Sequence, residues 1–114
     1  MPHIVIEYTN NLEEELKQAD LLSTVHHTAI QSGLFSARAI KTRLREIDDY
    51  IIGEHPKSTG SFIHISVALL QGRIPEQKLA LSQSLHKILK SKFPKADSLS
   101  VDVRDMDKTS YSKL

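Results

Sequence analysis

The sequence contains no cysteine and no tryptophan, and three tyrosines and three phenylalanines are its only aromatic residues. Without cysteine, a disulfide scaffold and a thiolate metal site are both excluded. The scarcity of aromatic side chains disfavours a platform on which nucleic-acid bases stack. Lys and Arg number 15 against 14 Asp and Glu, which leaves a net charge of +1 and no general basic field. We therefore expect no nucleic-acid partner.

Long hydrophobic runs are also missing: the longest has about four residues, whereas a membrane span needs about 20. The first residues carry neither the basic nor the apolar region of a signal peptide. The four glycines are scattered singly, so there is no phosphate-binding loop, and the six histidines lack a metal-ligand spacing. We expect a cytoplasmic protein that uses no membrane, metal or cofactor.

The chain length of 114 residues fits one domain, 1–114, with a polar tail at 107–114. Only 39% of the residues are hydrophobic, which is modest for so small a domain. This composition indicates that some apolar surface is buried between subunits.

Four segments have the alternation of β-strands: 2–9, 38–47, 61–70 and 98–104. In the first, Pro2, Ile4, Ile6 and Tyr8 share one side. The second places Ile40, Thr42 and Leu44 on one face and Lys41, Arg43 and Arg45 on the other.

Two segments have helical spacing. The first runs from Leu12 to a predicted end at Ser32-Gly33, with glycine just past the helix. The second begins at Pro75, which suits a first helical position, and ends before Pro94. The expected buried positions are Leu12, Leu16, Ala19, Leu22, His26, Ala29 and Ile30 in the first helix, and Leu79, Leu81, Leu85, Ile88, Leu89 and Phe93 in the second.

The predicted order is β-α-β-β-α-β, and strand, helix and strand occur twice, at 2–47 and 61–105. Two right-handed βαβ units in one four-stranded sheet put both helices on one face, an α+β fold. The other face is then bare, with Phe62, Ala68 and Leu70 pointing there. Self-association over that face is the expected remedy.

Pro2 is the first candidate for chemistry. An initiator Met before proline is normally removed, and the freed proline nitrogen is a secondary amine that can carry a proton. A free α-amino group has a pKa of about 7.7–8.0, so part of it is unprotonated at pH 7 and can act as a base. The ordinary alternative is a proline tolerated at the start of a strand.

Four cations are candidates for binding an anion. Arg73 follows a buried strand and precedes a helix, in the kind of turn where ligands gather, and its guanidinium suits a carboxylate. Lys41, Arg43 and Arg45 share a strand face and form a candidate cluster for an anion. The alternatives are a surface arginine and a solvated sheet face.

The final Ser112-Lys113-Leu114 has the form of a peroxisomal address.

Several stretches, in this order along the chain, resemble the tautomerase superfamily, and within it most the 5-carboxymethyl-2-hydroxymuconate isomerase family. The second half also resembles the short 4-oxalocrotonate tautomerase. The stretches are Pro2-His3-Ile4-Val5-Ile6-Glu7, Ser32-Gly33-Leu34-Phe35, Ile40-Lys41-Thr42-Arg43, Phe62-Ile63-His64-Ile65, Gly72-Arg73 and Glu76-Gln77-Lys78.

The resemblance implies a homotrimer of tautomerase-like βαββαβ subunits, each a fused pair of βαβ units, and an enzyme that needs no cofactor. It makes Pro2 the catalytic base and Arg73 a substrate-binding residue. Lys41 falls where the family often has a second arginine, and lysine keeps the charge but loses the bidentate fork. Arg43, two residues on, is the alternative binder. The implied reaction is a proton shift in an unsaturated keto or enol dicarboxylate such as 5-carboxymethyl-2-hydroxymuconate.

Two alternatives stay open. The same fold and the same Pro2 suit a phenylpyruvate-type tautomerase or a hydrolytic dehalogenase. A non-catalytic trimeric module that binds a small anion or a protein is the third interpretation.

Overall fold

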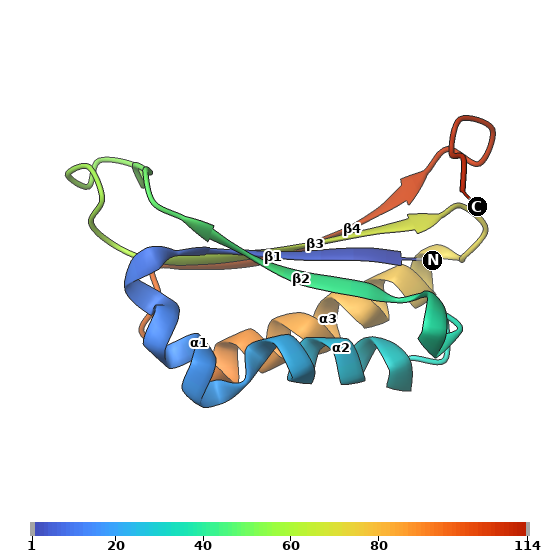
Figure 1. The fold of residues 1–114 in the computed structure, drawn as a ribbon, viewed down its shortest axis with the longest axis horizontal. Helices are drawn as coiled ribbons and strands as arrows, with labels where there is room; N and C mark the ends of the chain where they lie inside the picture. Colours follow the sequence, from blue (N-terminus) through green and yellow to red (C-terminus); the bar gives the residue numbers. More distant parts are fainter. Residues whose placement is uncertain (1, 114) are drawn as a thin grey trace.

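A four-stranded sheet with helices on one face makes up the computed structural model, which describes residues 2–113 (Figure 1). Met1 and Leu114 lie outside the described residues, and with them the expected loss of Met1 and the last residue of the Ser112-Lys113-Leu114 signal. The elements are β1 (Pro2–Thr9), η1 (Asn10–Leu12), α1 (Glu13–Ala19), α2 (Leu21–Gln31), η2 (Ala37–Ala39), β2 (Lys41–Ile47), β3 (Phe62–Leu70), α3 (Pro75–Lys92) and β4 (Ser98–Met106).

The strands lie in the order β2-β1-β3-β4. The pairs β1–β2 and β3–β4 are parallel, and the central pair β1–β3 is antiparallel. Each parallel pair is joined through helices that cross the same face of the sheet (Figure 1). The fused pair of βαβ units is therefore confirmed.

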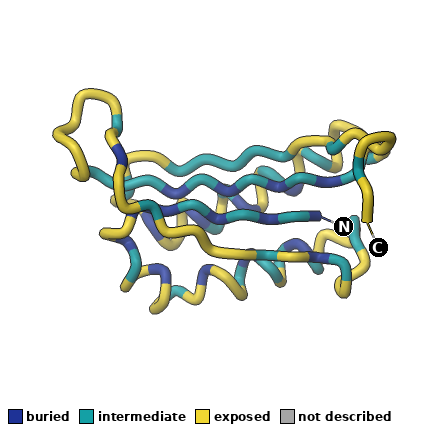
Figure 2. The backbone as a smooth tube through the Cα atoms, turned by 45° about the horizontal axis from the view of Figure 1, so that its top comes forward, coloured by how far each residue is buried: buried dark blue, intermediate teal, exposed yellow. Residues whose placement is uncertain are grey.

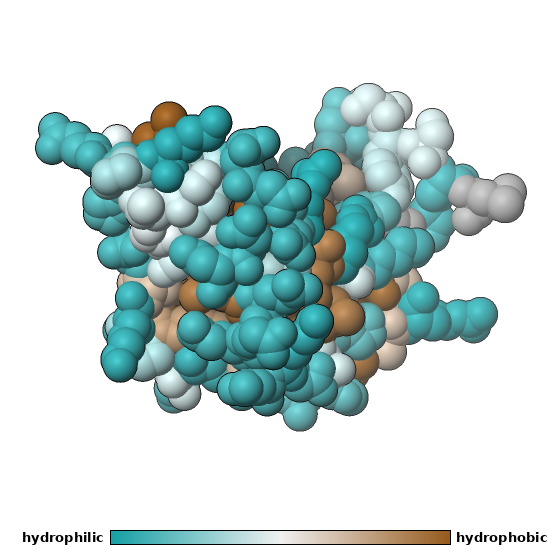
Figure 3. Space-filling model, turned by 60° about the vertical axis from the view of Figure 1, so that its left-hand side comes forward, coloured by the Kyte–Doolittle hydropathy of each residue, from teal (hydrophilic) through white to brown (hydrophobic). Residues whose placement is uncertain are grey.

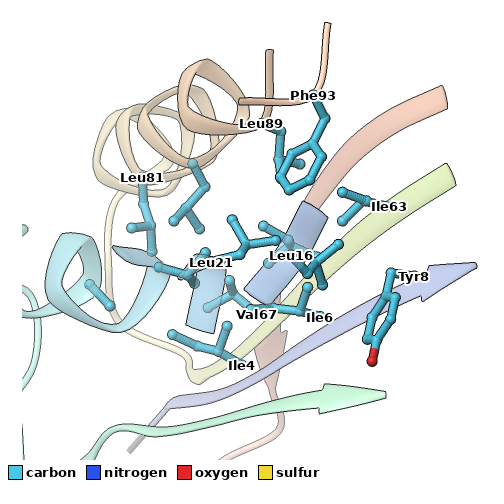
Figure 4. Close-up of a cluster of buried hydrophobic side chains, with 14 of the residues drawn as sticks. Ile4, Ile6, Tyr8, Leu16, Leu21, Ile63, Val67, Leu81, Leu89 and Phe93 are labelled. Atoms are coloured by element: carbon cyan, nitrogen blue, oxygen red, sulfur yellow. The ribbon is translucent and has the colours of Figure 1, made fainter. Parts of the chain in front are cut away.

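The core lies between the sheet and the helices. Buried and half-buried residues alternate along β1 and β3, whereas the edge strand β2 is mostly exposed (Figure 2). Ile4, Ile6, Ile63 and Val67 point from the central strands toward the helices, and Phe93 closes one end of the cluster (Figure 4). Burial of such side chains is worth about 1.5–3 kcal/mol each, so the two central strands carry much of the stability.

The prediction of one continuous helix from Leu12 to Ser32 is wrong. Asp20 has a left-handed backbone, with φ of 48° and ψ of 54°, and separates α1 from α2. This break shifts the helical phase, so the predicted core positions Leu22 and His26 do not hold: Leu22 is 37% exposed and His26 half-buried. The residues buried in their place are Leu21 and Val25, with Ala29 buried as predicted.

Other helix ends follow the sequence. Gly33 lies just past α2 with φ of 74°, the left-handed conformation expected of a residue that ends a helix. Pro75 is the first residue of α3, which ends before Pro94. Leu79 is the exception in α3, since it is 56% exposed rather than buried.

The face of the sheet away from the helices, which we call the open face, is bare as predicted but polar in composition. It carries half-buried and exposed side chains from all four strands, namely His3, Val5, Glu7, Lys41, Arg43, Arg45, Phe62, His64, Ser66, Ala68, Leu70, Ser100, Asp102 and Arg104. Phe62, Ala68 and Leu70 lie on this face as predicted, and polar side chains surround them. Tyr50, from the loop that follows β2, packs edge-on against Phe62 with ring centroids 6.0 Å apart.

The open face is a trough, because the loop at 48–60 rises at one end of the sheet and the C-terminal segment rises at the other (Figure 1). Seen from the side of that loop, hydrophilic side chains cover most of the surface, with small hydrophobic areas between them (Figure 3). Within residues 2–113, no helix is long and apolar enough to cross a membrane.

Candidate active site

Pro2 is the first residue of the central strand β1, and it is buried. It lies opposite Leu69, near the end of β3. Alternation along β1 puts it on the same side as Ile4 and Ile6, toward the helix layer. The start of the chain is therefore held by the sheet, at the end where β3 finishes.

Arg73 lies at the same end of the sheet, in the turn between β3 and α3. Its Nη1 donates a hydrogen bond of 3.1 Å to the carbonyl oxygen of Leu70, the residue after the partner of Pro2. Its Nη2 donates one of 2.8 Å to the carbonyl oxygen of Leu34. The guanidinium carbon is 5.2 Å from the centre of the Phe35 ring, a cation–π geometry.

A surface hollow of about 380 Å³ opens beside this guanidinium, lined also by Gly33, Leu34, Gly72 and Gln77. A guanidinium has five N–H donors, and the two protein bonds of Arg73 use two of them. A fixed, partly buried cation with donors to spare beside a hollow is the arrangement that a carboxylate ligand needs.

Lys41 and Arg43 lie on the open face, one on either side of Thr42, and both are exposed. Lys41 pairs with His3 across the β1–β2 ladder. Arg43 pairs with Val5, yet its Nη2 reaches back to Nδ1 of His3 at 3.2 Å. Both cations thus gather near the start of β1, on the opposite face of the sheet from the Pro2 ring.

Arg45, the third cation of the predicted cluster, makes a different contact. Its Nη1 is 3.6 Å from Oε2 of Glu7, a residue opposite it on β1. The three cations of this strand face therefore differ in their partners: Arg45 contacts a carboxylate, Arg43 contacts the His3 imidazole, and Lys41 reaches the carbonyl oxygen of Ala39 at 3.5 Å.

His3 is the residue that sequence reasoning missed. Its Nε2 lies 2.9 Å from the hydroxyl of Tyr111, and the two rings meet edge-on. Burial, and then the positive charges of Arg43 and Lys41, lower the pKa of His3 from its usual value near 6.5. Its chain neighbour Pro2 was a signal, but nothing in the sequence links it to a tyrosine 108 positions away.

The described residues contain no set of side chains that could bind a metal ion. Among residues 2–113 no three His, Asp or Glu side chains gather as a metal site would require. His3 and His64 share the open face, but His3 lies opposite Ala68 and His64 opposite Glu7, so four residue positions separate them along each strand. His26 instead bonds Thr42 on the other face, at 2.7 Å.

Comparison with known families decides the assignment. The profile of the 5-carboxymethyl-2-hydroxymuconate isomerase family matches residues 2–113. The chain belongs to this family. It is accordingly an enzyme, an isomerase that acts as an intramolecular oxidoreductase.

Individual relatives agree with the family. The chain is 25% identical over 93 residues to the 5-carboxymethyl-2-hydroxymuconate Delta-isomerase of Escherichia coli, covering 82% of this chain and 73% of that protein. The crystal structure of a 5-carboxymethyl-2-hydroxymuconate isomerase from Deinococcus radiodurans R1 superposes with a TM-score of 0.85 and 23% identity, over 99% of this chain and 88% of that one.

A fused 4-OT described as a symmetric trimer is also similar, with a TM-score of 0.78 and 20% identity over 97% of this chain and 90% of its own. At that identity the likeness establishes the fold alone.

Proposed function

We propose that this chain isomerises 5-carboxymethyl-2-hydroxymuconate, or a closely similar unsaturated keto or enol dicarboxylate, with the Pro2 nitrogen as general base. The proposal requires removal of Met1, because only a terminal proline has a basic nitrogen. The observation that carries it is the position of Pro2, buried at the start of the central strand and at the same end of the sheet as the Arg73 guanidinium.

The reaction is a balanced proton shift. The Pro2 amine removes one proton from the substrate, which leaves a dienolate whose negative charge spreads over the conjugated system. The protonated amine then returns the proton at another carbon, so that the double bonds move and nothing is oxidised or added. Arg73 binds one carboxylate, and Lys41 or Arg43 binds the other and stabilises the developing charge.

The positions of Arg73, Lys41 and Arg43 are consistent with a site that surrounds the start of β1 and receives cations from two directions. Arg73 approaches from the end of β3, and the two β2 cations approach from the open face. We infer that the working unit is a homotrimer, since the outer edges of β2 and β4 have no strand partner within the described chain and Leu44 on β2 is 39% exposed. Light scattering should then give about three times the 12.9 kDa of one chain.

The decisive experiment begins with mass spectrometry of the amino terminus. With Met1 removed, Pro2→Ala is expected to lower kcat by about 10²-fold or more on the diacid, and a form that keeps Met1 should be impaired as strongly. Full activity in both would remove Pro2 from the mechanism. A higher kcat/KM for phenylpyruvate than for the diacid would favour the phenylpyruvate-type alternative.

A further inference from the structure

His3 makes two side-chain hydrogen bonds, and one of its ring nitrogens must accept while the other must donate. Arg43 approaches Nδ1 at 3.2 Å, and a guanidinium only donates, so Nδ1 must be an unprotonated acceptor. The ring proton of a neutral imidazole then resides on Nε2, which donates to the Tyr111 hydroxyl at 2.9 Å. A doubly protonated ring would point a second N–H at Arg43, so these contacts define one tautomer.

The surroundings of the ring favour the same state. The charged groups that act on it are all positive, namely Arg43 and Lys41 on β2 and the amino terminus, and its partner on β3 is Ala68, which has no charge. No carboxylate is among the groups that act on it in the described chain. Arg43 therefore contacts an uncharged ring, whereas Arg45, two positions further along β2, contacts the carboxylate of Glu7.

The contacts of His3 also set where Arg43 points. Arg43 pairs with Val5, and its side chain extends back by two strand positions to the level of His3, next in the chain to Pro2. The C-terminal segment runs close to the start of β1 (Figure 2). There the Tyr111 hydroxyl meets the other side of the ring, and the backbone N–H of Lys108 donates to the Gln71 side chain at 2.9 Å. One ring therefore joins the cationic strand, the first strand and the tail.

From these contacts we propose that His3 is a positioning residue for the isomerase, which as its Nε2–H tautomer holds the Arg43 guanidinium beside the start of β1 and holds the C-terminal segment through Tyr111. This rests on the proposed function, in which Arg43 binds a substrate carboxylate. A cation held in place loses little conformational freedom when the diacid arrives, so His3 acts on substrate binding more than on proton transfer.

Two substitutions at this position separate positioning from mere packing. Asn places its amide oxygen where Nδ1 lies and still accepts from Arg43, whereas Leu fills similar space without an acceptor. We expect His3→Leu to raise KM for the diacid about tenfold, with kcat within about threefold, and His3→Asn to keep KM within about threefold of the wild type.

The matched control is His64→Leu. His64 lies on the same face and bonds a hydroxyl, that of Ser100, through Nδ1 at 2.6 Å, but within residues 2–113 it makes no hydrogen bond to a cation. Its KM and kcat should match the wild type. An unchanged KM in His3→Leu, or equal damage in His3→Leu and His3→Asn, would overturn the proposal.

Nitrogen-15 NMR of the imidazole rings tests the proposal without any substrate. At about pH 8, where a free histidine is neutral, His3 should appear as the Nε2–H tautomer, and Arg43→Gln should weaken that preference. An Nδ1–H tautomer would overturn the proposal even in an active enzyme. Conversely, loss of the proposed function would appear as wild-type inactivity on the diacid, with the tautomer still readable.

Discussion

The Arg73 guanidinium donates a hydrogen bond of 2.8 Å to the carbonyl oxygen of Leu34, although 39 positions separate the two residues. A second bond reaches the carbonyl oxygen of Leu70, so one side chain joins the loop after α2 to the end of β3. A residue proposed to bind substrate thus also holds the wall of its own hollow together.

Replacement of Arg73 should therefore affect stability as well as activity. We expect Arg73→Ala to lower the free energy of unfolding by about 1–3 kcal/mol, because two carbonyl oxygens lose a charged donor. Arg73→Lys should recover only part of it, since a single ammonium lacks the planar fork that spans both acceptors. Urea unfolding measures the difference. Arg38→Ala, at an exposed position, is the control and should stay within about 0.5 kcal/mol. A wild-type midpoint in Arg73→Ala would contradict a structural role.

Lys41 and Arg45 form a matched pair for binding, since both are exposed cations on the open face of β2. Lys41→Ala should raise KM for the dicarboxylate about tenfold, because an unneutralised charge near Pro2 is lost. Arg45→Ala should change KM by less than about twofold, because its charge is already met by Glu7. Steady-state kinetics at one ionic strength decides between them, and equal effects would argue against a specific role for Lys41.

Asp20 separates the two helices with a left-handed backbone that most side chains adopt at a cost. Asp20→Val should lower the free energy of unfolding by about 1–2 kcal/mol, whereas Asp20→Gly should keep or slightly raise it. Gln18→Val, exposed on α1, is the control for helix propensity and should cost about 0.5 kcal/mol. The prediction fails if the valine variants at positions 18 and 20 unfold at the same denaturant concentration.

The lowered pKa of His3 predicts a pH-dependent difference in stability. In the unfolded chain this ring titrates near 6.5, and in the folded chain it titrates lower, so the unfolded state binds more protons in acid. The contribution of His3 to stability is therefore present above about pH 6.5 and is lost as the pH falls through the folded pKa. Unfolding free energies of the wild type relative to His3→Asn should be constant above about pH 7 and should decline below about pH 6.5. A difference that does not change with pH would contradict the shift.

Several parts of the fold follow from local sequence patterns. The alternation at 2–9 and 61–70 predicts the two central strands, and Pro75 predicts the first residue of α3. These predictions succeed because β-strand pleating and the fixed φ of proline act over a few residues, independently of the rest of the chain. The βαββαβ order follows in turn from the sequence of these elements.

Asp20 marks where local reasoning fails. A single residue in the left-handed conformation changes which face of the following helix meets the sheet. Leu21 and Val25 are therefore buried in place of Leu22 and His26. The sequence spacing is compatible with burial of either Leu21 and Val25 or Leu22 and His26, and packing against the sheet selects the first pair.

Local patterns in the chain were enough to place the central strands, most of the helix ends, the cations on β2 and the proline that begins the first strand. They were not enough to place the start of β2, since Ala37–Ala39 forms a 3-10 turn that overlaps the predicted strand 38–47, or to show what the site residues contact. The register of β1 and β2 aligns His3 with Lys41, and the path of the tail brings Tyr111 to the same ring. His3 and Tyr111 are 108 positions apart, and they meet because the elements between them pack into one fold. No local pattern in the sequence predicts such a contact.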